Sequence, residues 1–281
     1  MNSHTTAVDG IPVTYHVAGQ GPVCLLHPGG PGFTWEYLRS TALEEHLTTV
    51  YVEPLGTGAS GRLASHPHGY TRALHARAVE AVLNDLGVEQ AHLLGHSYGG
   101  FVTQYCATHL ADRLSGVILY DSAPASDAPF FAEASRGVEE FLRRHPDATA
   151  VSEAWQQVPT IGDDETFARV ARAILPLYFA DFRGHEAFED VVHGGHVTGL
   201  DELGVPDLID DRGTVETITV DTLVLVGQHD FICGPRWAQE LHKRIPGAEL
   251  VTFENSGHFA HVEEPEKFAS VVAGFVSRAT G

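Results

Sequence analysis

A serine flanked by glycines follows a short apolar run in the stretch LLGHSYGG, Leu93 to Gly100. The run Gln90–Leu94 predicts a buried strand, and Phe101–Leu110 carries apolar residues at helical spacing. Ser97 would then lie on a sharp strand-to-helix turn, where glycines allow close backbone approach and strained dihedral angles. Such a turn exposes the hydroxyl to a base, which makes Ser97 a candidate nucleophile. The alternative is an ordinary glycine-rich turn, because a lone G-x-S-x-G pattern occurs in many unrelated chains.

An acid and a histidine follow two later strands. Asp230 ends the apolar run in DTLVLVGQHD, and His258 lies in SGH just after the predicted strand Glu249–Phe253. Side chains at the carboxyl ends of parallel strands gather at one edge of the sheet. A serine hydroxyl is a poor nucleophile near neutral pH, so His258 would take its proton, and Asp230 would orient His258 and stabilise the imidazolium. The chain order serine, acid, histidine predicts a catalytic triad.

Each of these residues has an alternative interpretation. Asp230 could cap the helix that begins near Pro235, with Asp221 or Glu254 serving as the acid. His261 competes with His258, which we favour because SGH directly follows the strand. The joint occurrence of all three residues favours Ser97, Asp230 and His258.

A developing oxyanion needs hydrogen-bond donors. One would be the backbone N–H of Tyr98, immediately after the nucleophile. The second would come from HPGGPG, His27–Gly32, which follows the predicted strand Val23–Leu26. Pro28 has no N–H, so the donor is Gly29 or Gly30. A plain tight turn is the alternative for this loop.

The elements that must position these residues alternate between strands and helices. A hairpin is predicted around Asp9-Gly10, and the alternation stops between residues 124 and 213, where helical patterns mix with Gly, Pro, His and acidic residues. Alternation predicts an α/β fold with a mostly parallel sheet and helices on both faces. We expect a core over residues 1–123 and 214–281 and a helical cap insertion over 124–213. Further predicted elements are the helices Trp35–Leu47, Thr71–Leu86, Phe131–Arg144, Glu165–Leu177 and Arg236–Ile245, a final helix starting at Pro265, and the strands Thr49–Glu53 and Gly116–Ala123.

The composition of the chain limits the binding partners and the cellular location that we expect. The 281 residues are 43% hydrophobic and 19% charged, which predicts a substantial core. The formal net charge of −20 excludes nucleic acid as an expected partner, because phosphate binding needs a basic surface. No apolar run reaches the length of a membrane span, and the N-terminal stretch lacks the pattern of a signal peptide. We therefore expect a cytoplasmic protein with no membrane partner; the oligomeric state stays open.

Cysteines and histidines show no metal-ligand pattern. Cys24, Cys106 and Cys233 are an odd number without ligand spacing and are expected to be reduced thiols. The pairs His66/His68 and His193/His196 lack a recognisable third ligand, so surface or loop histidines are the preferred interpretation. No metal or organic cofactor is expected.

These motifs together resemble the α/β-hydrolase superfamily and, within it, the proline iminopeptidase group. HPGGPG is similar to that group's HGGPG, GHSYGG to its G-x-S-x-G-G elbow, and GQHDFICGP to its Asp shortly before a Cys-Pro or similar pair; SGHFAHVEEPEKF is typical of the superfamily. The chain departs at HPGGPG, which has an extra residue or a substituted histidine, and at VEPLGTGASGR, where the group often has an acidic-Gln-Arg-Gly turn. The resemblance implies an α/β-hydrolase fold.

The resemblance also implies an activity, namely release of an N-terminal residue, often proline, from a small peptide or aminoacyl amide through an acyl-enzyme. Iminopeptidases hold the substrate's α-amino group with cap glutamates, but no cap motif matches here, and Glu133, Glu139, Glu153 and Glu202 are only some of many carboxylates. Cys233 near Asp230 is expected to be an inert buried thiol. The alternatives are an esterase or lactonase acting on a small apolar ester, and a non-catalytic small-molecule binding protein.

Overall fold

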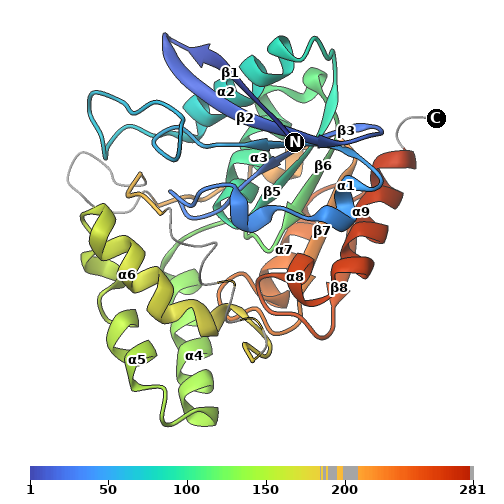
Figure 1. Ribbon diagram of the computed structural model, residues 1–281. Coiled ribbons are helices and arrows are strands. Elements are labelled where there is room, and N and C mark those ends of the chain that lie inside the picture. The colour runs from blue at the N-terminus through green and yellow to red at the C-terminus, as the bar shows by residue number, and fades with distance from the viewer. Residues whose placement is uncertain (184, 186–187, 189–194, 199–207, 279–281) are drawn as a thin grey trace.

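The described residues form one eight-stranded sheet in the computed structural model, which describes residues 1–183, 185, 188, 195–198 and 208–278 (Figure 1). The strand order is β1-β2-β4-β3-β5-β6-β7-β8. β1 and β2 pair antiparallel to each other and β2 to β4, and all remaining pairs are parallel. The mostly parallel sheet expected from the alternation is therefore confirmed. The strands are β1 Asn2–Val8, β2 Ile11–Gly19, β3 Val23–His27, β4 Thr48–Val52, β5 Ala91–His96, β6 Leu114–Tyr120, β7 Thr222–Gly227 and β8 Glu249–Phe253.

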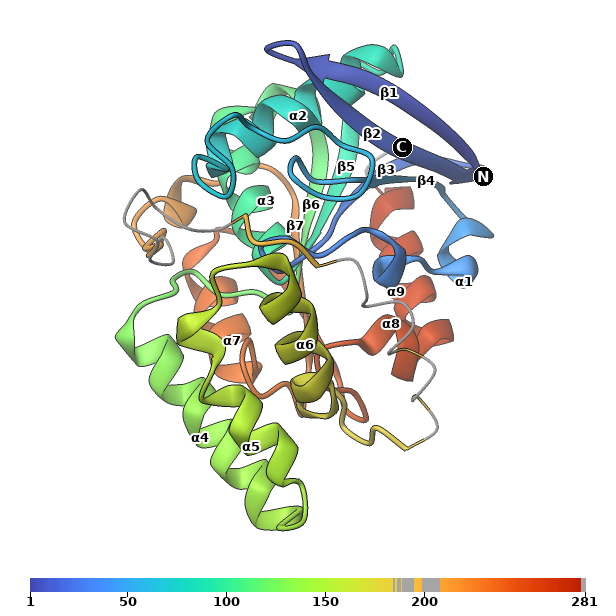
Figure 2. The ribbon, with the colours of Figure 1, turned by 60° about the vertical axis from the view of Figure 1, so that its left-hand side comes forward.

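Helices cover both faces of the sheet (Figures 1 and 2). Helices α2, α3 and α7 pack with one face, and α1 and α9 with the other. No helix among the described residues is long and apolar enough to cross a membrane. The α-helices are α1 Thr41–Glu44, α2 Arg72–Asp85, α3 Tyr98–His109, α4 Ala128–Arg144, α5 Thr149–Trp155, α6 Asp164–Ile174, α7 Pro235–Arg244, α8 Ala260–Glu263 and α9 Pro265–Arg278.

Successive residues of the central strands point to opposite faces, as strand geometry requires. Leu93 of β5 packs with the cluster that includes α2 and α3, whereas Leu94 packs with the cluster that includes α9. All six residues of β5 are buried. A parallel strand covered on both faces has no solvent-facing side, which explains why its sequence, AHLLGH, does not alternate between apolar and polar residues.

The helix predicted over Trp35–Leu47 is wrong. The segment contains a 3₁₀ turn, η1 (Glu36–Leu38), followed by the short helix α1. Between them Arg39 and Ser40 are extended, and the Ser40 side chain accepts a hydrogen bond from the Leu43 N–H as the N-cap of α1. The serine inside an apolar pattern is thus a helix start, which periodicity alone did not detect.

The segment between β6 and β7 begins and ends side by side at the edge of the core. Ala125 and Asp210 form an antiparallel bridge, and the Ser126 N–H donates to the Ile209 carbonyl at 2.9 Å. Figures 1 and 2 both show α4, α5 and α6 grouped on one side of the sheet. These helices have a small apolar cluster of their own that reaches Phe231 of the core. The bridge lies close to the predicted cap boundaries at 124 and 213, which stay a prediction.

Several of the eighteen histidines are buried and neutral. Burial lowers the pKa of His27 to about 4, that of His75 to about 3 and that of His261 to about 4. Protonating any of them would place a charge in the interior, where charged groups are costly.

Folding stability should therefore fall as the pH drops. Because these pKa values are lower in the folded state, the unfolded chain binds more protons below about pH 6.5, so each histidine removes about 1.4 kcal/mol per pH unit in that window. We expect His75→Leu to give a shallower loss between about pH 6 and pH 4, measured by denaturant unfolding. The matched control is His46→Leu at an exposed site, whose slope should equal that of the wild type; equal slopes for all three proteins would contradict the prediction.

Candidate active site

Ser97 occupies the turn between β5 and α3 in a strained backbone conformation. Its φ is 54° and its ψ is −117°, and the residue directly precedes Tyr98, the first residue of α3. The neighbouring backbones are so close that a Cβ on Gly95 would lie 2.0 Å from the Gly99 carbonyl oxygen. Glycine is therefore required at position 95, and the predicted sharp turn is confirmed.

Asp230 and His258 form a buried pair. His258 Nδ1 lies 2.7 Å from Asp230 Oδ2, and both side chains are almost fully shielded from solvent. Asp230 Oδ1 accepts further hydrogen bonds from the N–H groups of Ile232 and Cys233, at 2.9 and 3.1 Å. Because a carboxylate can only accept, His258 Nδ1 carries a proton, which makes Nε2 the ring atom that can take a proton from another group.

The alternatives from the sequence lie elsewhere. His261 bonds the Tyr120 hydroxyl through Nδ1 and the Tyr37 carbonyl through Nε2, at 2.9 and 2.8 Å. Asp221 and Glu254 are exposed. Helix α7 has Gly234 at its N-cap with no side-chain cap, so Asp230 does not cap it.

The glycine-rich loop after β3 lies against the Ser97 turn. A Cβ on Gly29 would lie 2.7 Å from the Ser97 Cβ. The Gly29 N–H donates to the Tyr37 hydroxyl at 2.6 Å, whereas the Gly30 N–H donates to no described residue. Of the two predicted donors, Gly30 is the one whose N–H is available to a ligand.

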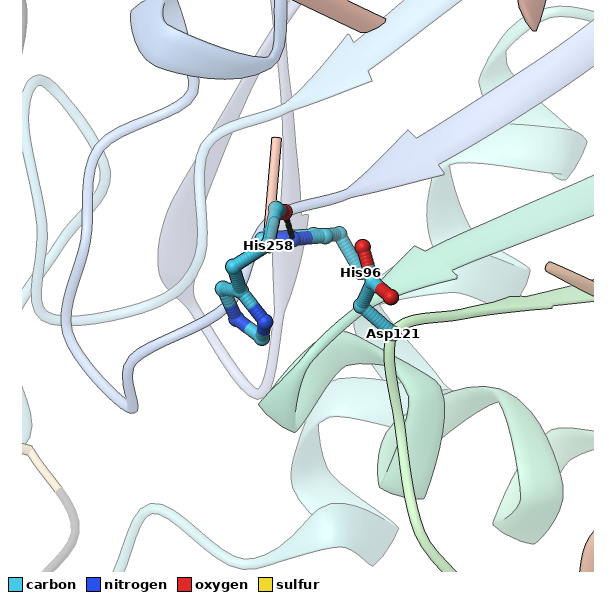
Figure 3. Close-up of side chains that lie close together, drawn as sticks. All are labelled: His96, Asp121 and His258. Carbon is cyan, nitrogen blue, oxygen red and sulfur yellow. Dashed lines mark hydrogen bonds between the residues drawn. The ribbon is translucent and has the colours of Figure 1, made fainter. Parts of the chain in front are cut away.

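His96 and Tyr37 connect this loop to the His258 loop. His96 Nε2 lies 2.9 Å from the His258 carbonyl oxygen and must donate to it (dashed line in Figure 3). Burial, with the neighbouring His258 and His261, lowers the pKa of His96 well below its ordinary value, so the ring is neutral and Nδ1 is bare. The Tyr37 hydroxyl, 2.7 Å away, therefore donates to Nδ1 while accepting from Gly29. Each hydrogen bond in this series therefore points the same way, from the Gly29 N–H toward the His258 carbonyl.

A pocket lies over Ser97 and His258. Gly29, Gly30, Tyr37 and His96 contribute to it, and the rest of its lining is apolar or aromatic: Phe33, Ala171, Leu175, Tyr178, Ile232 and Phe259. Ala171 lies on α6, and Leu175 and Tyr178 lie on the 3₁₀ turn η4 (Leu175–Tyr178). The insertion is anchored here, because the His258 N–H donates to the Tyr178 carbonyl at 2.6 Å. The insertion thus supplies one wall of the pocket.

Similarity to known proteins shows the family of this chain. The model of the alpha/beta hydrolase family matches residues 24–271. The chain belongs to the alpha/beta hydrolase family. It is 28% identical to 2-hydroxymuconate semialdehyde hydrolase of Pseudomonas sp. (strain CF600), over 96% of this chain and 92% of that protein.

One further relative and one solved structure carry different named activities. A proline iminopeptidase of Saccharolobus solfataricus is 28% identical over 94% of this chain and 87% of its own length. The crystal structure of the esterase RhEst1 from Rhodococcus sp. ECU1013 has a TM-score of 0.77 at 22% identity, covering 99% of each chain, which shows the shared fold.

The other residues singled out in this alpha/beta hydrolase contribute little to the pocket. Glu133 pairs with Arg236 and Arg136, and Glu139 and Glu153 are exposed. His66 bonds the Tyr70 hydroxyl, and His196 bonds Asp164 and Arg62. Glu202 and His193 lie outside the described residues.

Cys233 lies beside Ser97 and Asp230. Burial, followed by the negative charges of Asp230 and Asp121, raises the pKa of its thiol well above the ordinary value. A neutral thiol is a weak nucleophile, in agreement with the expected inert cysteine. The side chains that could hold a metal, His96–Asp121–His258 and Asp230–Cys233–His258, are those of this same site, so we assign no separate metal centre to them.

Three residues of the site were missed by the sequence analysis: Tyr37, His96 and Asp121. His96 stands in GHSYGG and Asp121 directly follows the apolar strand β6, so their positions at strand ends were a usable signal. Tyr37 lies in the segment wrongly predicted as one helix.

Removing the Tyr37 hydroxyl should destabilise the protein. In Tyr37→Phe the Gly29 N–H and His96 Nδ1 lose their partner in the interior, so the free energy of unfolding should fall by about 1–3 kcal/mol. Denaturant unfolding measures this loss. The control is Tyr105→Phe, since the Tyr105 hydroxyl bonds no described residue; similar small losses in both variants would contradict the prediction.

Proposed function

We propose that this alpha/beta hydrolase is a serine hydrolase that works through an acyl-enzyme, with Ser97 as nucleophile, His258 as base and acid, and Asp230 as the residue that orients His258. The observation that carries the proposal is the buried 2.7 Å bond between His258 Nδ1 and Asp230, which makes Nε2 the ring atom that can take a proton in the pocket that also contains Ser97.

Acylation begins when Ser97 Oγ attacks the scissile carbonyl carbon and its proton passes to His258 Nε2. Asp230 stabilises the imidazolium that forms, and the negative charge develops on the substrate oxygen. The backbone N–H groups of Tyr98 and Gly30 stabilise this oxyanion, because Tyr98 begins α3 directly after Ser97 and Gly30 lines the same pocket from the loop after β3. His258 then protonates the leaving group, and the carbon–leaving-group bond breaks.

Deacylation repeats these steps with water. His258 takes a proton from the water molecule as it attacks the ester carbon, the same donors hold the second oxyanion, and the proton returns to Ser97 Oγ as the acid is released. No residue is consumed, so the free enzyme is restored.

For the substrate we favour an N-terminal residue of proline type, as a small peptide or aminoacyl amide. Support comes from the HPGGPG and GQHDFICGP motifs and from the iminopeptidase among the relatives. The apolar and aromatic lining also suits a pyrrolidine ring, since aromatic faces such as those of Phe33 and Tyr178 can attract its cationic nitrogen.

A second candidate is hydrolysis of a small apolar ester or lactone. The same lining favours it, because the apolar wall needs no charged group on the acyl part. A non-catalytic binding protein would use the same pocket without turnover. The helical cap over residues 124–213, a cytoplasmic location and the lack of a nucleic-acid partner remain part of this proposal.

Activity on a substrate panel tests the proposal. We expect prolyl arylamide to be hydrolysed with a higher kcat/KM than short acyl p-nitrophenyl esters, and an N-capped prolyl arylamide to be inert because its nitrogen is no longer cationic. Ser97→Ala should lose at least about 10³-fold in kcat on every substrate.

Each other outcome has a defined meaning. Ester turnover with inert arylamides would replace the iminopeptidase assignment by the esterase or lactonase. A fluorophosphonate probe that fails to label Ser97 in the wild-type protein would support the binding protein and overturn the serine hydrolase. Ser135→Ala is the control variant, because Ser135 is exposed on α4 and does not line the pocket.

A further inference from the structure

A second acid lies buried beside the proposed triad. Asp121 directly follows β6, the strand between β5, which leads to Ser97, and β7, which leads to Asp230. Its side chain is fully buried and its φ is 44°. Figure 3 shows it next to His96 and His258, and one polar atom from each of these three side chains lies within 4.8 Å of the others.

Asp121 and Asp230 are neighbours in the fold, because both bond the backbone of Gly227: the Asp230 N–H donates to the Gly227 carbonyl at 3.2 Å. Asp121 Oδ1 accepts from the Gly227 N–H at 2.8 Å, while Oδ2 accepts no hydrogen bond from the described residues. Two ionised carboxylates cannot bond each other, because both can only accept. A hydrogen bond between them therefore requires a proton on one of them.

The donors around each group decide which one holds the proton. Asp230 accepts three hydrogen bonds, from His258 Nδ1 and from the N–H groups of Ile232 and Cys233, whereas Asp121 accepts one. Hydrogen bonds to the ionised form favour ionisation, so Asp230 keeps the charge.

The surroundings of Asp121 agree with this. Burial, followed by the negative charge of Asp230, raises the pKa of Asp121 well above its ordinary value. Described basic side chains that face it are imidazoles, and that of His96 is neutral. The titratable groups that face Asp121 are Asp230, Cys233, His96, His258, Glu263 and Tyr120.

We propose that Asp121 is protonated in the folded protein and donates its proton in a hydrogen bond to the Asp230 carboxylate. Asp121 is then a positioning residue: it holds Asp230 in the orientation that receives His258 Nδ1 and brings no second negative charge to the site. Its effect on turnover rests on the proposed function, whereas its protonation does not.

The Asn variant separates a neutral donor from a charged group. In Asp121→Asn the amide N–H can donate to Asp230 and its carbonyl can accept from Gly227, so kcat/KM should stay within a few-fold of wild type with an unchanged pH profile. Asp121→Leu keeps the branched shape of the side chain without a donor, and kcat should fall by about 10- to 100-fold with KM little changed. Asp221→Asn, at an exposed site, is the matched control. Equal losses in the Asn and Leu variants, or a shifted pH profile in Asp121→Asn, would overturn the proposal.

Two measurements need no substrate, so they hold if the proposed function fails. Infrared spectra near pH 7 should contain the carbonyl band of a protonated carboxyl that is lost in Asp121→Asn; a wild-type spectrum without it overturns the proposal.

Stability gives a second readout, because an acid whose folded pKa is raised loses stabilisation as the pH rises above its ordinary value of 3.8. The Tm advantage of Asp121→Asn over wild type should therefore grow from pH 5 to pH 8 by about a few degrees, and a constant difference would contradict the inference. If Asp121 is ionised and the wild-type protein is active, only this inference is refuted. If Asp121 is protonated and the protein has no hydrolase activity, only the proposed function is refuted.

Discussion

The backbone of Ser97 has a positive φ that a serine adopts only when its surroundings hold it there, at a cost of about 1–3 kcal/mol. Two hydrogen bonds fix it from the neighbouring strand: the Ser97 N–H donates to the Tyr120 carbonyl at 2.9 Å, and the Ser122 hydroxyl donates to the Ser97 carbonyl at 2.9 Å. Both partners lie at or just after the end of β6. The close approach of β5, α3 and β6 therefore holds the hydroxyl in place, and the glycines of the elbow make that approach possible.

The Ser97 turn can take part in catalysis only if the loops that carry the other groups stay at a fixed distance from it. Hydrogen bonds between buried polar groups keep these loops in position. Gly29, Tyr37, His96 and the His258 carbonyl form one directed series, which connects the loop after β3 to the loop after β8 through the residue that precedes Ser97. Since His96 is neutral, its tautomer is set by its two partners, and each bond fixes the direction of the next. The network positions the groups without bringing a charge close to His258.

Much of the fold followed from the sequence, because its strands are apolar runs of the right length and its catalytic motifs stand at their ends. Ser97, Asp230 and His258 were predicted on that ground, and the structure brings Asp230 and His258 into contact. The failure at residues 35–47 has a local cause: Ser40 competes for the backbone as an N-cap, and apolar spacing does not record that. The proposal of Gly30 rather than Gly29 as an oxyanion donor depended on the Tyr37 hydroxyl, which bonds the Gly29 N–H through a tertiary contact that the sequence does not reveal. Asp121 was missed because an acid at a strand end has no distinctive spacing; only its burial against Asp230 sets it apart.

The order of strands explains why such an acid is tolerated. The proposed nucleophile, acid and base follow β5, β7 and β8, so β6 ends in the gap between Ser97 and Asp230. Whatever residue follows β6 must accept the Gly227 N–H on one side and meet a carboxylate on the other. An apolar side chain leaves the N–H unpartnered, and an ionised acid repels Asp230. A neutral carboxyl satisfies both neighbours, since one oxygen accepts while the other donates. The protonated state inferred for Asp121 therefore allows β6 to end among the three proposed catalytic residues without adding a second negative charge beside Asp230.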